Sequence, residues 1–172
     1  IEIMEKPTWQ HAQAIAELHN ETPKRQGRKY PHYGITPKQV LWHLKCAENT
    51  THILAYYEDK AVGILRIEWG DNTAVISQLL TSIHHRDKAV ANILISSAVK
   101  QAEEHKIQYM VYGRMMGHNP TLEAFKKHSG FTPFKTPRIA IALSRLGKLY
   151  VKLGLHRKTQ DLIPKAIWRL LT

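Results

Sequence analysis

Residues 73–131 decide the fold: TAVISQLLTSI (73–83) reads as an apolar strand, HHRDKAVA (84–91) as a basic turn that opens a helix, IQYMVYG (107–113) as a second strand, and NPTLEAFKKHSGF (119–131) as a second helix. The order strand, turn, helix, strand, helix is a βαβα unit. The first amides of a helix have no partner within the helix, and the helix dipole is positive there, so such a turn binds anions. We therefore expect a site for a phosphorylated cofactor at the first turn.

The turn has the charge and the small residues that suit a phosphate. Arg86 and Lys88 are cationic, and Ala89 and Ala91 are small enough for a ligand to approach the backbone. A structural alternative stays open, because Asp87 could accept from the first amides of the helix and repel a phosphate. A short basic turn alone does not separate the two interpretations.

The sequence before this unit predicts two helices and an antiparallel meander. Thr8 can cap a helix over residues 9–20, and a capping box with proline at the first helical position starts a helix over residues 36–47. THILAYY (51–57) and AVGILRIEW (61–69) are rich in β-forming residues and read as a hairpin. Residues 1–5 read as an edge strand.

Composition indicates a single globular domain. A chain of 172 residues can build one core, and its hydrophobic share of 43% with 23% charged residues is typical of folded proteins. The lone Cys46 excludes an intramolecular disulfide and favours a reducing compartment. The first residues, IEIMEKPTW, have no signal-peptide pattern, so we expect a cytoplasmic protein.

The positive charge gathers at the C-terminal end. Residues 144–172 hold seven Lys or Arg against one Asp, so this tail supplies more than half of the net charge of +11. Leucines recur at helical spacing over residues 143–153, and a second short helix could start at Pro164. The apolar side of such a tail can pack on the body or on a second subunit of a homodimer, or it can lie on an anionic membrane surface and make the protein peripheral to the membrane.

These motifs together resemble the GNAT superfamily of N-acetyltransferases, in a divergent form. The family's acyl-CoA motif, R/Q-x-x-G-x-G/A, falls on residues 86–91, where Arg86 and Ala91 match and Ala89 replaces the central glycine. Residues 119–131 are similar to the second motif, an asparagine that opens a helix ending in Gly-Phe. The resemblance implies an α/β fold with a splayed mixed β-sheet flanked by helices over residues 1–143, followed by a basic amphipathic extension at 144–172.

The resemblance also implies a site for acetyl-CoA or another acyl-CoA. Its pantetheine arm would lie between the two strands of the unit, its pyrophosphate would meet the amides of the turn, and its thioester would lie near the second helix. Asn119 and Phe125 also have ordinary explanations, as a helix cap and as part of an apolar stripe. The implied cofactor-binding residues are Leu80, Thr81, Arg86, Asp87, Lys88, Ala89, Val90, Ala91, Asn119 and Phe125.

The catalytic positions depart from the family. Members often have a carboxylate on the strand before the turn, but residues 73–83 contain none. Lys126 stands where a tyrosine often protonates the leaving thiolate; it could act as the acid or be an ordinary solvated lysine. Candidate bases are Glu68, His84 and His118. His43 and Cys46 are too few for a metal site, so we expect no metal.

We expect an acyltransferase that moves an acetyl or other acyl group from acyl-CoA to an amine in a small-molecule or glycan acceptor, such as an amino sugar or another anionic or glycan-linked substrate. The loop over residues 21–34 mixes cations with tyrosines and could line the acceptor site, although we favour a solvated loop. The alternative is a noncatalytic GNAT-like module that contacts nucleic acid or an anionic membrane through the tail. Nucleic acid is the weaker partner, because the chain has no helix-turn-helix, zinc-finger or RNA-binding motif.

Overall fold

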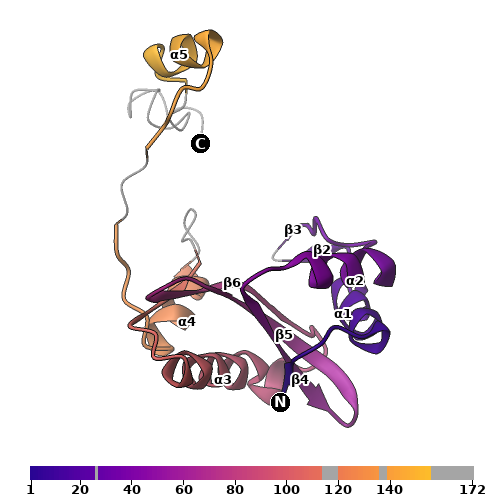
Figure 1. Ribbon diagram of the computed structural model, residues 1–172. Helices are drawn as coiled ribbons and strands as arrows, with labels where there is room; N and C mark the ends of the chain where they lie inside the picture. Colours follow the sequence, from indigo (N-terminus) through magenta and orange to yellow (C-terminus); the bar gives the residue numbers. More distant parts are fainter. Residues whose placement is uncertain (26, 114–119, 136–138, 156–172) are drawn as a thin grey trace. The chain divides into compact units, whose positions relative to one another are not determined.

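The computed structural model describes residues 1–25, 27–113, 120–135 and 139–155 (Figure 1). The chain divides into two compact units, Ile1–Thr132 and Pro133–Thr172. The first unit contains the sheet and the second contains helix α5 (Arg145–Lys152). The functional boundary between residues 143 and 144 stays a prediction.

In the described part of the chain, five strands form one mixed sheet in the order β1-β4-β5-β6-β7. The pairs from β1 to β6 are antiparallel, and β7 runs parallel to β6. Glu58 and Asp59 join β4 to β5 with φ values of 49° and 62°, as a two-residue hairpin turn requires. The predicted edge strand and meander are therefore confirmed, with β1 at Glu2–Met4, β4 at Thr50–Tyr57, β5 at Lys60–Trp69, β6 at Thr73–Thr81 and β7 at Tyr109–Tyr112.

The helices begin where the sequence predicts caps. Thr8 and Thr36 each accept from the amide three residues on, in complete capping boxes. Between these two helices lies a small hairpin of β2 (Lys24–Arg25) and β3 (Arg28–Lys29). Among the described residues of this unit, the helices are α1 (Trp9–Asn20), α2 (Pro37–Cys46), α3 (Val90–Glu104) and α4 (Pro120–His128), and a 3-10 turn, η1 (Arg86–Lys88), comes before α3.

Helices cover both faces of the sheet (Figure 1). Apolar residues of α1 and α2 pack with Leu54, Ile64 and Leu80, whereas α3 packs against the opposite face. Gly63 allows α3 to lie close to β5, since a Cβ there would lie 2.6 Å from a methyl of Val90. Burial of these two apolar layers fixes the position of the α3 N-terminus.

The sheet splays between β6 and β7. The two strands pair only from Thr73 with Tyr109 to Ile76 with Tyr112, and β6 then continues alone on that side. A β-bulge at the same level leaves Ser77 as the extra residue between the partners of β5. We call the point after the Ile76–Tyr112 pair the fork. The expected splayed mixed sheet is thus confirmed.

The second unit is built around α5. Ser144 caps this helix by accepting from the amide of Gly147 at 3.0 Å. Leu146, Leu149 and Leu153 are exposed along it. The helix predicted from Pro164 lies outside the described residues. No helix in the described part of the chain has the length and apolarity needed to cross a membrane.

Candidate active site

The turn between β6 and α3 has a strained backbone at Ala89. This residue has φ 51° and ψ 31°, in the left-handed region, and α3 begins at the next residue. This conformation raises the free energy of an L-residue by roughly 1–2 kcal/mol, whereas glycine adopts it without this strain. The turn therefore needs a positive φ at the position where the family motif has glycine, and Ala89 supplies it at a cost.

No side chain in the described part of the chain caps the start of α3. The Asp87 carboxylate instead lies 3.5 Å from the Lys88 ammonium, which also lies 4.9 Å from the centre of the Tyr57 ring. The interpretation of Asp87 as the cap of α3 is therefore wrong. The first turn of α3 therefore follows an exposed basic turn and has no side-chain cap among the described residues, an arrangement that favours an anion.

A small cavity of about 220 Å³ lies beside this turn. Its lining includes three cations, Lys24, Arg25 and Arg86, together with the end of β6 from Thr81 to Ile83. The cations come from two distant segments of sequence. This cavity has the charge to hold a phosphate group next to the α3 N-terminus.

Lys126 is buried at the fork. It is 7% exposed, and its Nζ donates to the carbonyl oxygen of Tyr112 at 2.7 Å and lies 4.3 Å from the centre of that ring. Burial lowers the pKa of Lys126 and raises that of Tyr112 to about 12. The interpretation of Lys126 as a solvated lysine is therefore wrong. Because Tyr112 is the last residue of β7 that pairs with β6, the ammonium lies where the strands separate.

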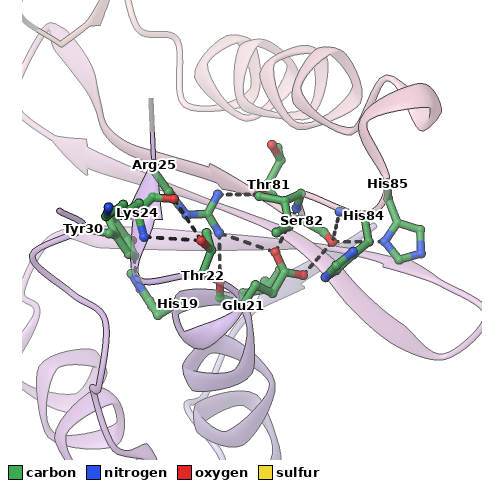
Figure 2. Close-up of polar contacts among 12 residues, drawn as sticks. His19, Glu21, Thr22, Lys24, Arg25, Tyr30, Thr81, Ser82, His84 and His85 are labelled. Atoms are coloured by element: carbon green, nitrogen blue, oxygen red, sulfur yellow. Dashed lines mark hydrogen bonds and ion pairs between the residues drawn. The ribbon is translucent and has the colours of Figure 1, made fainter. Parts of the chain in front are cut away.

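Glu21, at the end of α1, holds the end of β6 (Figure 2). Its carboxylate accepts from the Ser82 hydroxyl at 2.6 Å and from the Ile83 amide at 2.8 Å. The Ser82 oxygen in turn accepts from the amide of His84 at 3.2 Å and lies 3.1 Å from Nδ1 of His85. A single carboxylate thus ties α1 to the segment that leads into the turn.

Arg25 completes this network from the other side (Figure 2). Its guanidinium donates to the carbonyls of Thr81 at 2.9 Å and Leu18 at 3.0 Å, and it lies 3.4 Å from the Glu21 carboxylate. The side chain is only 18% exposed, and its Nε has no acceptor within the described residues. Our preference for a solvated loop is therefore wrong at Arg25 and at the half-buried Tyr30.

A larger cavity, of about 710 Å³, lies on the face of the sheet covered by α1 and α2. It reaches β5 and β6 at the bulge, which lies at the same level along β6 as the fork. The lining is mainly polar around the bulge and contains several histidines. The polar residues that matter most are His19, Tyr30, His52, Arg66, Ser77 and Gln78.

Two histidines of this cavity are held neutral. Burial lowers the pKa of His19 to about 4, with further contributions from His32 and Arg25. Burial likewise lowers the pKa of His52 to about 4, assisted by Arg66. His19 lies 2.6 Å from the Tyr30 hydroxyl through Nδ1. The interior of this cavity therefore disfavours positive charge.

The structure brings some of the predicted site residues together. Thr81 and Arg86 line the smaller cavity, and Leu80 and Thr81 line the larger one. Phe125 packs against the core beneath α3, as its apolar-stripe explanation predicts. His118 and Asn119 lie outside the described residues, so their predicted roles stay predictions.

The two remaining candidate bases, Glu68 and His84, are either paired with another side chain or exposed to solvent. Glu68 forms an ion pair with Arg66 at 2.8 Å and pairs with Val75 in the strand register. His84 is exposed after β6. The sequence does not predict a role for Glu21 or His19. The local signal for Glu21 is a carboxylate at the start of a basic loop. His19 falls on the apolar face of a predicted helix, so its pattern does not distinguish it from a core residue.

Comparisons with known proteins agree with this geometry. The sequence profile of the acetyltransferase (GNAT) family matches residues 12–131. No curated protein matches the chain by sequence.

Solved structures share the fold at low sequence identity. The ribosomal-protein-alanine N-acetyltransferase from Brucella melitensis biovar Abortus 2308 is 14% identical, with a TM-score of 0.60 over 81% of this chain and 96% of that one. An aminoglycoside 6'-N-acetyltransferase from Acinetobacter haemolyticus is 15% identical, with a TM-score of 0.58 over 81% of this chain and 96% of that one. The aminoglycoside N-acetyltransferase AAC(6')-Iy, solved with a bisubstrate analogue of CoA, is 14% identical, with a TM-score of 0.59 over 84% of this chain and 97% of that one.

The profile match extends from α1 to the end of α4 and includes the turn, the fork and both cavities. The chain therefore belongs to the GNAT acetyltransferase family, whose members transfer an acetyl group from acetyl-CoA to an amine.

Proposed function

We propose that this chain transfers an acetyl group, or another acyl group, from acyl-CoA to the amine of a small-molecule or glycan acceptor. The observation that carries the proposal is the α3 N-terminus, which no side chain caps in the described structure and which adjoins a basic cavity. It follows directly after a strand whose last residues are open toward β7. A helix N-terminus supplies amides for the pyrophosphate, and an open strand edge supplies carbonyls and amides for the pantetheine arm.

This arrangement supports the proposed cofactor residues. Leu80 and Thr81 would border the arm, Arg86 and Lys88 would add charge, and the backbone of residues 86–91 would meet the pyrophosphate. The Thr81 carbonyl already accepts from Arg25, so the arm shares or displaces that contact. Asn119 and Phe125 would border the thioester end.

The reaction is a direct attack within a ternary complex. The amine nitrogen forms a bond to the thioester carbonyl carbon, the carbon–sulfur bond breaks, and the CoA sulfur leaves as a thiolate. Lys126 gives its proton to that thiolate, because its ammonium lies at the fork and burial moves its pKa toward the working pH. The amine loses its proton to solvent or to Glu68, His84 or His118, and positioning supplies much of the rate.

The acceptor enters through the larger cavity. Its volume of about 710 Å³ and polar lining suit a small amine, including an amino sugar or another anionic or glycan-linked substrate. The exposed leucines and the cations of α5 support an added contact with an anionic membrane surface or with a second copy of the chain.

Release of free CoA thiol from acetyl-CoA, measured with a panel of amines, tests the proposal. Lys126→Met should lower kcat roughly 100-fold or more while the affinity for acetyl-CoA stays unchanged, because the step lost is proton transfer. Lys126→Arg, which keeps the charge, should change the pH profile of kcat. The matched control is Lys127→Met, since Lys127 is 58% exposed and forms an exposed ion pair with Glu123. A wild-type kcat in Lys126→Met would remove Lys126 from the mechanism, and no thiol release with any amine would overturn the proposed function.

A further inference from the structure

The larger cavity has cations on its wall and no carboxylate among its described lining residues. Arg25 and Arg66 both line it, together with four histidines. Each arginine has a carboxylate partner that is not among these lining residues, Glu21 for Arg25 and Glu68 for Arg66. The described lining therefore offers a ligand guanidinium groups and polar side chains but no carboxylate.

Arg66 is the cation closest to the bulge in the strand register. It pairs with Gln78, and its Nε donates to the hydroxyl of Ser77 at 2.8 Å. Its ion pair with Glu68 is partly exposed on both sides, 34% for Arg66 and 48% for Glu68. Exposed ion pairs contribute little to stability, so Arg66 can exchange Glu68 for an anion of a ligand at small cost.

The same burial and the same arginines act on two histidines of this cavity. Burial and neighbouring cations keep His19 and His52 neutral by lowering the pKa of each to about 4. An ammonium group in this cavity would meet the same desolvation and the same arginines. Aminoglycosides, which two of the structural neighbours are named for acetylating, carry several ammonium groups, and the described lining residues provide no carboxylate to pair with them.

We infer that the acceptor is a small amine that also carries an anionic oxygen group, a carboxylate or a phosphate, bound by Arg66 beside the bulge, and that the cavity rejects polycationic amines. The inference rests on the proposed function and names its substrate class. A guanidinium binds carboxylate and phosphate with paired N–H donors, so both anions share one recognition chemistry. The same cations favour the uncharged form of the acceptor amine, the form that attacks, which reduces the need for a carboxylate base on β6.

Matched acceptor pairs test the inference with the wild-type protein. One pair is an α-amino acid and its carboxamide, and the other is an amino sugar phosphate and the same sugar without phosphate; an aminoglycoside is the fifth acceptor. Rates of thiol release are compared per concentration of unprotonated amine, so that differences in amine pKa cancel. We expect kcat/KM to be about 10- to 100-fold higher for the anionic member of at least one pair, as for a charge-assisted hydrogen bond. The pair that responds identifies carboxylate or phosphate as the anion.

Substitutions at Arg66 assign the preference to this residue. Arg66→Gln should remove the preference, measured as the ratio of kcat/KM between the two members of a pair in the same variant, whereas Arg66→Lys should restore part of that ratio. Arg145→Gln, an exposed arginine on α5, is the matched control and should keep the full preference. Thermal melting with and without acetyl-CoA verifies that each variant folds and binds the cofactor.

Two outcomes would overturn the inference while the proposed function stands. One is efficient acetylation of the aminoglycoside or of both neutral members, with no gain from the anion. The other is an anion preference that survives intact in a folded Arg66→Gln protein. Absence of transfer to every acceptor, by contrast, contradicts the proposed function itself and with it the inference.

Discussion

The turn after β6 and the larger cavity differ in how they meet a ligand. The turn is exposed, continuous in sequence over residues 84–91, and built from backbone amides whose direction depends on Ala89. The cavity is lined by side chains from α1, α2, the segment between them and the strands β4, β5 and β6, and burial keeps two of its histidines neutral. Binding at the turn therefore depends on backbone conformation, whereas selection in the cavity depends on desolvation and on arginine.

The two buried histidines of the cavity should make the free energy of unfolding depend on pH. Unfolded histidines bind a proton near pH 6.5, but His19 and His52 bind one in the folded state only near pH 4. The contribution of these two histidines to the free energy of unfolding is therefore fully present above about pH 6.5. It is lost as the pH drops toward 4, by at most about 3 kcal/mol for each histidine.

Urea unfolding at pH 8 and pH 5 measures this loss. His52→Gln should reduce the drop between the two pH values, because one of the groups that protonates only on unfolding is gone. A drop of wild-type size in His52→Gln would mean that this histidine is not held neutral by the fold.

Glu21 connects the two regions, because it accepts from Ser82 and Ile83 at the turn and pairs with Arg25 at the cavity. Glu21→Gln should lower the free energy of unfolding by about 2 kcal/mol, the size of a hydrogen bond to a charged group. Equilibrium urea unfolding measures the change, and Glu17→Gln on the exposed side of α1 is the matched control. Equal losses in the two variants would show that the network does not stabilise the junction.

A glycine at position 89 should change the stability of the protein through the backbone of the turn. Ala89→Gly should raise the free energy of unfolding by about 1 kcal/mol, since glycine relieves the left-handed strain. Ala91→Gly, the same substitution within the first turn of α3, should lower it by about 1 kcal/mol. Thermal melts of both variants measure the contrast, and a loss at Ala89 as large as that at Ala91 would argue against a strained turn.

The same contrast explains how much the sequence could predict. The βαβα order, the capped helices at Thr8 and Thr36, and the basic turn depend on neighbouring residues, so local patterns revealed them. The cavity joins His19 to Gln78, which are far apart in sequence, and no local pattern marks that contact. Motif alignment alone predicts Lys126 at the site, whereas its burial and its bond from α4 to the Tyr112 carbonyl of β7 depend on tertiary structure that no local pattern marks.

The most direct test of the account is calorimetric titration of the protein with acetyl-CoA. We predict saturable binding to the wild-type chain, weakened at least tenfold by Arg86→Glu and by Ala89→Asp, because each places a carboxylate where the pyrophosphate would lie. Arg145→Glu, with the same charge change on α5, should bind acetyl-CoA like the wild type. No binding to the wild-type chain, or undiminished binding to both turn variants, would contradict a cofactor site at the α3 N-terminus.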